Sequence, residues 1–186
     1  MGCLEKLCKL AQKMHTCVKI TMDSSGQWKI KIECCHYMDS EKVCEKFEGS
    51  GVNLQTAASN FCFEFMSKYK GRSFVCADNC NCMQHESHYE NLERLYLTLG
   101  KELEAEDSCL CVRWVEADNN YGVFFSECTL TSGNSMVPCY MNGSIDGAAE
   151  HLFNYSLHKK IKTKASTGGG KTVDVDLIIN NWKEEG

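Results

Sequence analysis

The feature that most constrains the fold is an internal echo, in which short landmarks of the first half recur in the second half. Three pairs of landmarks share an offset of 94 residues: Cys17-Val18-Lys19 with Cys111-Val112-Arg113, Glu33-Cys34 with Glu127-Cys128, and Gly49-Ser50 with Gly143-Ser144. After a shorter loop, Leu54-Gln55-Thr56-Ala57-Ala58 is echoed by Ile145-Asp146-Gly147-Ala148-Ala149. One spacing held across a strand pair, a turn and a helix start favours duplication of a structural unit.

Hydrophobic periodicity gives the first unit the order α-β-β-β-α. Residues 2–14 have apolar side chains at the three- and four-residue steps of an amphipathic helix. Alternation over residues 18–22 and 28–34 predicts a hairpin, and a third strand is expected around residues 43–48. The aromatic stripe between Leu54 and Tyr69 predicts a closing helix that lies across one face of the sheet.

The second unit follows the same order. Its expected elements are a helix over residues 92–103, strands over 111–117, 121–130 and 136–141, and a closing helix from Ala148 to Ile161. Residues 173–179 alternate strictly and predict a last strand, for which Phe74-Val75-Cys76 is a shorter counterpart.

The predicted class is therefore α+β, with two tandem α-β-β-β-α(-β) repeats whose antiparallel sheets are each covered by helices on one face. The expected divisions are a first repeat (1–72), a Cys/His-rich connector (73–88), a second repeat (89–164), and a Gly-rich linker with the C-terminal strand (165–186). A chain of 186 residues gives each repeat a marginal core, and an interface shared between the repeats relieves that shortage.

Fourteen cysteines in a secreted chain would predict a disulfide framework. Residues 1–16 have no apolar core of signal-peptide length, because lysines interrupt them, and no other stretch is long enough to cross a bilayer. We therefore expect a cytoplasmic protein with reduced cysteines that serve as small buried side chains.

One local cluster contains soft metal ligands. Its five candidates are Cys76, Cys80, Cys82, His85 and His88. Structural zinc requires four Cys or His ligands in a tetrahedral array, which this set could supply. Because the paired CxxC spacing of zinc fingers is missing, the expected cofactor is none, and a structural zinc is the alternative.

No group of residues has the spacing of a catalytic site. Cys34, Cys35 and His36 adjoin, but neighbours on a strand point to opposite faces. His151 and His158 are seven residues apart on the predicted closing helix, as expected of a surface pair. The sequence therefore predicts a protein that is not an enzyme.

In topology, the repeated α-β-β-β-α order resembles the double-stranded RNA-binding domain, a family in which tandem copies are common. Those domains grip phosphates through lysines at the start of the final helix, where this chain has residues 53–56 and 145–148 without lysine. The resemblance implies a nucleic-acid-binding tandem repeat protein as an alternative function. Its candidate contacts are Lys19, Lys29, Lys31, Lys42 and Lys46.

Charge is uneven, with a net charge of +3 over residues 1–72 and −8 over the remainder. In size, acidity and cysteine-rich, proline-poor composition, the chain resembles accessory proteins of bacteriophages and mobile elements, among them the anti-CRISPR inhibitors. This resemblance implies a non-enzymatic inhibitor that docks an acidic surface on the basic nucleic-acid channel of a host nuclease, such as a Cas effector, with no membrane contact. The expected contact residues are Glu102, Glu104, Glu106, Asp107, Glu116 and Asp118. Simple solvation of a helix end is the alternative role for these acids, and a zinc-stabilised interaction scaffold is a third function.

Overall fold

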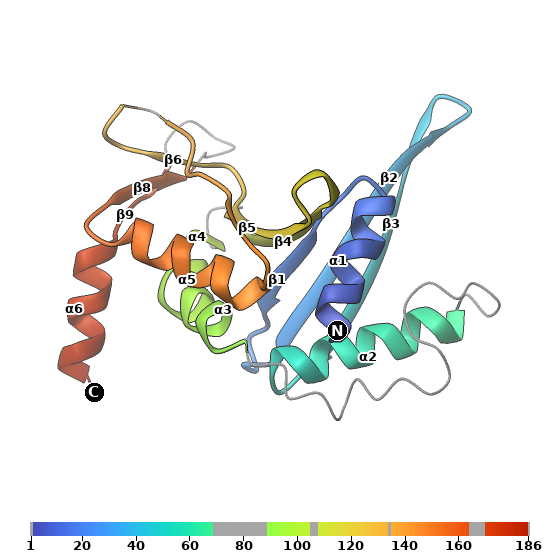
Figure 1. Ribbon diagram of the computed structural model, residues 1–186, viewed down its shortest axis with the longest axis horizontal. Coiled ribbons are helices and arrows are strands. Elements are labelled where there is room, and N and C mark those ends of the chain that lie inside the picture. The colour runs from blue at the N-terminus through green and yellow to red at the C-terminus, as the bar shows by residue number, and fades with distance from the viewer. Residues whose placement is uncertain (1, 69–88, 105–107, 134, 164–169, 186) are drawn as a thin grey trace.

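A computed structural model describes residues 2–68, 89–104, 108–133, 135–163 and 170–185. The described part of the chain confirms the α+β class, with helices packed on antiparallel sheets (Figure 1). It contains no helix that combines the length and the apolar character needed to cross a membrane.

The first half follows the expected order. Its elements are α1 (Cys3–Lys13), β1 (Val18–Met22), β2 (Trp28–Met38), β3 (Glu41–Gly51) and α2 (Leu54–Lys68). Asp23 shapes the β1–β2 turn, where its carboxylate accepts hydrogen bonds from the backbone N–H groups of Ser25 and Gln27. Asp39 and Ser40 both have positive φ, which suits a tight β2–β3 turn.

The second half begins with one continuous helical segment and continues with short strands. The helical segment comprises α3 (Glu90–Leu95), a π-helical stretch (Tyr96–Gly100) and α4 (Lys101–Glu104). The next elements are β4 (Leu110–Val115), a 3-10 turn (Glu116–Asp118), β5 (Asn120–Phe125), β6 (Cys128–Leu130), β7 (Tyr140–Asn142) and α5 (Ile145–Ser156). The last elements are β8 (Lys160–Thr163), β9 (Thr172–Asp174) and α6 (Val175–Glu185).

Strands of both halves join in one six-stranded antiparallel sheet, in the order β3-β2-β1-β4-β5-β7. Its central pair places Val18 opposite Val112, two residues that the sequence echo also matches. Each half supplies three strands, arranged in mirrored order around this pair. The duplication itself stays a prediction, but the two expected sheets form a single sheet.

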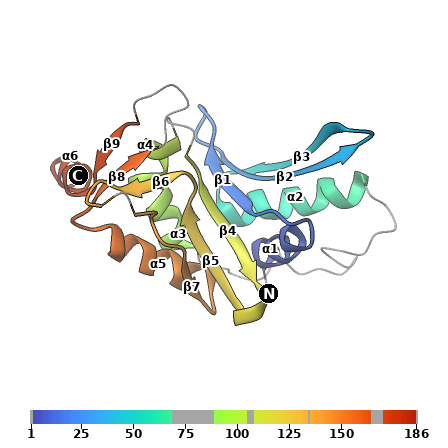
Figure 2. The ribbon, with the colours of Figure 1, turned by 90° about the horizontal axis from the view of Figure 1, so that it is seen from above.

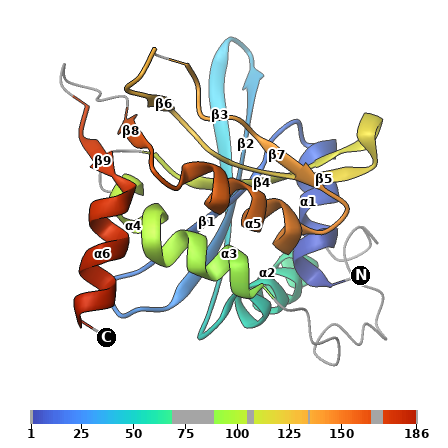
Figure 3. The ribbon, with the colours of Figure 1, turned by 60° about the vertical axis from the view of Figure 1, so that its left-hand side comes forward.

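The helices α1, α2, α3 and α5 of the described residues pack on one face of this sheet (Figures 2 and 3). α2 packs with Phe61 and Phe65 near Phe47 of β3, and the leading helical segment of the second half places Tyr96 beside Trp28 of β2. Contacts with α1 and α5 put these helices on the same side. Lys9 of α1 lies over the ring of Trp114 in β4, and the rings of Tyr140 in β7 and Tyr155 in α5 are in contact.

Side chains from both halves also join the helices to one another. The carboxylate of Asp146 in α5 accepts hydrogen bonds from the backbone N–H groups of Asn91 and Leu92 in α3, at 2.8 and 3.1 Å. The hydroxyl of Tyr89 donates to Glu5 of α1 at 2.7 Å. The helical layer is therefore continuous across the two halves.

Several predicted elements of the second half are wrong. The expected strand over residues 121–130 breaks after Phe125, because β6 leaves the main sheet to join β8 and β9 in a three-stranded sheet. The closing helix ends at Ser156 rather than Ile161, which lies in β8. Residues 136–141 contribute only a bridge at Met136 and the start of β7.

The predicted C-terminal strand over residues 173–179 is also wrong beyond Asp174. The Asp174 carboxylate accepts a hydrogen bond from the backbone N–H of Leu177 and so caps α6 at its start. Residues 175–185 are helical. The expected counterpart at Phe74-Val75-Cys76 lies outside the described residues.

The sequence predicted reduced cysteines, and one pair contradicts this prediction. Cys35 and Cys44 oppose each other on β2 and β3 and form a disulfide. This bond crosses the hairpin segment of residues 33–46, here called the arm, which projects beyond the helices (Figure 1). The other described cysteines lie outside disulfides.

Candidate functional site

The helix-free face of the six-stranded sheet gathers most of the basic residues of its strands. Side chains alternate between the two faces along a strand. Residues that alternate with Val18, Ile20 and the other buried positions therefore point away from the helices. The face carries six basic and two acidic residues: Lys19, Lys29, Lys31, Lys42, Lys46, Arg113, Glu33 and Glu48. We call this set the basic face.

Strand register brings the charges of the basic face together. Lys19 of β1 lies opposite Lys31 of β2, which in turn lies opposite Glu48 of β3. One step along, Lys29 lies opposite Ser50. Five of the six cations come from the first half of the chain, so the positive surplus of that half is concentrated on one surface.

Each carboxylate of the basic face is shared by two lysines. Glu33 pairs with Lys19 at 3.0 Å and with Lys46 at 3.1 Å. Glu48 pairs with Lys29 at 2.8 Å and with Lys31 at 3.7 Å. Hydrogen bonds from Lys19 and Lys46 lower the pKa of Glu33, and the pairing with Glu48 raises the pKa of Lys29. These pairs favour the charged forms of Glu33 and Lys29, and six cations against two carboxylates leave the face with a net positive charge.

Two cations of the basic face are not neutralised in this way. Within the described part of the chain, neither Lys42 nor Arg113 forms an ion pair with a carboxylate. The guanidinium of Arg113 lies 5.3 Å from the ring centre of Phe124, which belongs to the neighbouring strand β5. The pair offers a flat surface on the same face as the lysines.

Three thiols lie at the centre of the basic face, where β1 meets β4. Cys111 lies directly opposite Lys19, and Cys17 and Cys109 flank this position on their strands. The sulfur atoms of Cys109 and Cys111 are 3.4 Å apart, and Cys17 lies near enough for its thiol and that of Cys111 to shift each other's pKa.

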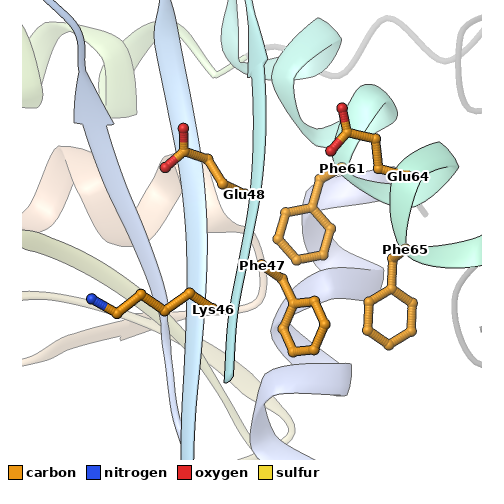
Figure 4. A pocket seen from close by; sticks show the side chains of 6 residues that line it. All are labelled: Lys46, Phe47, Glu48, Phe61, Glu64 and Phe65. Carbon is orange, nitrogen blue, oxygen red and sulfur yellow. The ribbon is translucent and has the colours of Figure 1, made fainter. Parts of the chain in front are cut away.

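A small hollow borders the basic face at the sheet edge, between β3 and α2 (Figure 4). Its volume is about 150 Å³, and its lining comprises Lys46, Phe47, Glu48, Phe61, Glu64 and Phe65. Phe47 and Phe61 are almost fully buried, so the hollow mainly exposes the edge of the aromatic core. Because small-molecule sites usually enclose about 300 Å³ or more, we do not assign a ligand to it.

The four described acids that were expected to contact a partner belong to two separate elements. Glu102 and Glu104 belong to α4, which precedes β4, whereas Glu116 and Asp118 belong to the 3-10 turn that follows β4. The strand β4, about 20 Å long, lies between the two sets in the chain. Glu102 forms an ion pair with Lys171 at 2.8 Å, and Glu116 accepts a hydrogen bond from Gln12 at 3.4 Å. Glu106 and Asp107 lie outside the described residues.

The other predicted site residues are also placed differently or lie beyond the described ranges. All five metal-ligand candidates, from Cys76 to His88, fall outside those ranges, and the described residues contain no other group suited to a metal ion. His151 and His158 do not share a helix, because α5 ends at Ser156. The ring of His158 instead pairs with Asp176 at 3.0 Å.

Sequence reasoning found the five lysines of the basic face but missed Arg113 and the two carboxylates. The alternation of residues 28–34 indicated which β2 residues share a face. What it could not supply was the register that places Glu33 between Lys19 and Lys46.

Comparisons with known proteins give no assignment, since no protein-family model, curated protein or solved structure matches this chain.

Proposed function

We propose that the protein binds nucleic acid, single strands in particular, across the basic face. The proposal is supported above all by one observation: six cations and only two carboxylates share a face that no described helix covers. When lysine and arginine side chains contact phosphate groups, the counterions bound to the nucleic acid are released. This release favours binding and does not depend on base sequence.

Lysines that share a carboxylate can exchange it for phosphate. The pairs of Glu33 and Glu48 are partly exposed, with lysine side-chain exposures from 27% for Lys29 to 73% for Lys46. Partly exposed pairs are worth only about 0–1 kcal/mol each, so a phosphate can replace the carboxylate at little cost. The carboxylates then limit the affinity without blocking the face.

The preference for single strands rests on Arg113 and Phe124. Unpaired bases stack on aromatic rings and on guanidinium planes, whereas a duplex hides the faces of its bases. The ring of Phe124 and the guanidinium above it lie on the same face as the lysines. A strand whose phosphates contact Lys19 and Lys31 would bring its bases within reach of this pair.

A test compares two pairs of lysines with the same spacing on a strand. In the first variant, Lys29→Gln and Lys31→Gln remove two charges from the basic face. In the control, Lys160→Gln and Lys162→Gln remove two charges from β8 of the small sheet. Binding of labelled single-stranded RNA and DNA of mixed sequence is measured by fluorescence anisotropy between 50 and 200 mM salt, with duplexes as competitors.

We expect the first variant to bind about tenfold or more weakly at 50 mM salt and to show a shallower salt dependence, by about 0.7 per lost phosphate contact in log K against log salt. The control should bind like the unmodified protein. Equal losses in both variants, or no salt-dependent binding at micromolar protein, would exclude the basic face as the site. Duplexes that compete as well as single strands would remove the preference but keep the surface.

The inhibitor that docks an acidic surface on a nuclease remains a prediction from the sequence. No contact in the described part of the chain favours it, since Glu102 and Glu104 belong to α4, whereas Glu116 and Asp118 belong to the 3-10 turn.

A further inference from the structure

Three thiols at the β1–β4 seam form a chemically distinct group that nucleic-acid binding does not use. The Cys111 thiol is 1% exposed and lies between Cys17 on the neighbouring strand and Cys109 on its own strand. Cys109 contacts Cys111 at 3.4 Å and the hydroxyl of Ser126 at 3.1 Å. Cys17 and Cys109 are both half-buried.

The surroundings of Cys17 favour its thiolate. A hydrogen bond from Cys111 lowers the pKa of Cys17 against the effect of burial, and Lys19 and Arg113 lower it further. The hydrogen bonds of Cys111 to Cys109 and Cys17, together with its burial, raise the pKa of Cys111. The pair thus consists of a partly exposed nucleophile and an adjacent protonated thiol that donates to it.

Other described cysteines lack this combination. Burial raises the pKa of Cys8, Cys128 and Cys139. The Cys34 thiol donates to the backbone carbonyl of Met14 at 3.9 Å, so its neighbour is a peptide group. Compared with Cys8, Cys128 and Cys139, Cys17 has a lowered pKa and lies beside a second thiol.

We propose that Cys17 is a modification site for small disulfides of the glutathione class and that Cys111 resolves the resulting mixed disulfide. The Cys17 thiolate attacks one sulfur of the small disulfide, which breaks the S–S bond and releases one small thiolate. The Cys111 thiol then loses its proton to solvent, and its sulfur attacks the Cys17 sulfur and displaces the second small molecule as a thiolate. Both released thiolates take up protons from solvent. Overall, two protein thiols are oxidised to one disulfide, and one small disulfide is reduced to two small thiols.

The product would link β1 to β4 covalently. These strands pair from Val18 opposite Val112 to Ile20 opposite Leu110. Cys111 lies opposite Lys19, so Cys17 is its diagonal neighbour on the same face, and the bond requires a small shift of the two strands. A Cys17–Cys111 disulfide would therefore join the first half of the chain to the second at the centre of the sheet. The Cys35–Cys44 disulfide, in contrast, lies within a single hairpin.

The test treats the full chain with oxidised glutathione, quenches samples with acid over time, and maps every modified cysteine by peptide mass spectrometry. Among the cysteines of the described residues, we expect Cys17 to carry the first adduct, at an initial rate about threefold or more above that of Cys139, because a lowered thiol pKa raises the thiolate fraction more than it lowers the nucleophilicity. In the unmodified chain this adduct should give way to a Cys17–Cys111 disulfide.

Two variants make the result decisive. Cys111→Ser removes the resolving thiol, so the mixed disulfide at Cys17 should persist. Cys139→Ser is the matched control, because it removes a half-buried thiol beside Arg113 on the same face and should leave the reaction unchanged. First adducts at Cys34 or Cys139, or a mixed disulfide at Cys17 that decays equally fast in the Cys111→Ser variant, would overturn the proposal.

Discussion

At the scale of single residues, Glu33 has more influence on the basic face than any one lysine. Its two carboxylate oxygens contact Lys19 and Lys46, which come from strands on either side of β2. Glu33 therefore holds two cations in place and also competes with any phosphate that approaches them. Removing its charge should expose both lysines to a ligand.

We expect Glu33→Gln to tighten binding of single-stranded nucleic acid about threefold to tenfold at low salt, because two lysines lose a competing carboxylate. The free energy of unfolding should fall by less than about 1 kcal/mol, since these pairs are partly exposed. Glu41→Gln is the control: it makes the same charge change on β3, on the face opposite Lys42. Anisotropy titrations of both variants check this, and equal gains would point to net charge alone.

At the scale of elements, two glycines of the sequence echo have different roles. A Cβ atom at Gly49 of β3 would lie 2.5 Å from the Cβ of Phe61 and 2.6 Å from the carbonyl oxygen of Ala57, both in α2. A Cβ atom at Gly143, its counterpart in the echo, would meet nothing within 4 Å. Gly51 of β3 is equally close, since a Cβ atom there would lie 2.6 Å from the backbone nitrogen of Ala57. The close approach of α2 to β3 thus depends on Gly49 and Gly51, and Gly143 has no such role.

Gly49→Ala should lower the free energy of unfolding by about 1–3 kcal/mol, because α2 must move away from the sheet. For a chain of this length, the melting temperature should fall by about 3–10 °C. Gly143→Ala should leave the melting temperature almost unchanged. Thermal unfolding followed by circular dichroism compares the two, and a similar loss in both would contradict the packing of α2 on β3.

The same contrast explains how far the sequence predicts the fold. The first half was predicted well because its strands are long and alternate over many residues, such as Trp28 to Cys34 in β2. In the second half, alternation at Val173, Val175 and Leu177 indicated a strand, but the cap from Asp174 to Leu177 starts a helix instead. Short apolar patterns fit both structures, so a local hydrogen bond decides between them.

The candidate site was predicted in part for a related reason. Composition identified the lysines, whereas strand pairing decides which of them share a face and which carboxylates lie between them. Register also decides which cysteines meet: Cys35 and Cys44 are opposite each other on neighbouring strands, and nothing in the spacing of fourteen cysteines singles out this pair.

At the scale of the whole molecule, the echo is only partly reflected in the strand register. The echo matches Ile20 with Trp114. Ile20 lies opposite Ile30, which is ten residues later in the chain, whereas Trp114 lies opposite Tyr121, which is seven residues later. The predicted match of Cys34 with Cys128 is therefore not reproduced, since Cys34 lies in the main sheet and Cys128 in the small one. What the halves share is a sheet and a core.

A shared core predicts that the two halves unfold together. Trp28 reports on the first half and packs against Tyr96 of the second, and Trp114 reports on the second half and lies under Lys9 of the first. In variants that keep only Trp28 (Trp114→Phe, Trp182→Phe) or only Trp114 (Trp28→Phe, Trp182→Phe), urea unfolding followed by fluorescence should give the same slope with urea concentration for both probes. After correction for the stability of each variant by circular dichroism, each fluorescence midpoint should coincide with the circular dichroism midpoint. A fluorescence transition that precedes the circular dichroism transition in either variant would mean that one half unfolds alone, and the pairing of β1 with β4 would then not join the halves into one cooperative unit.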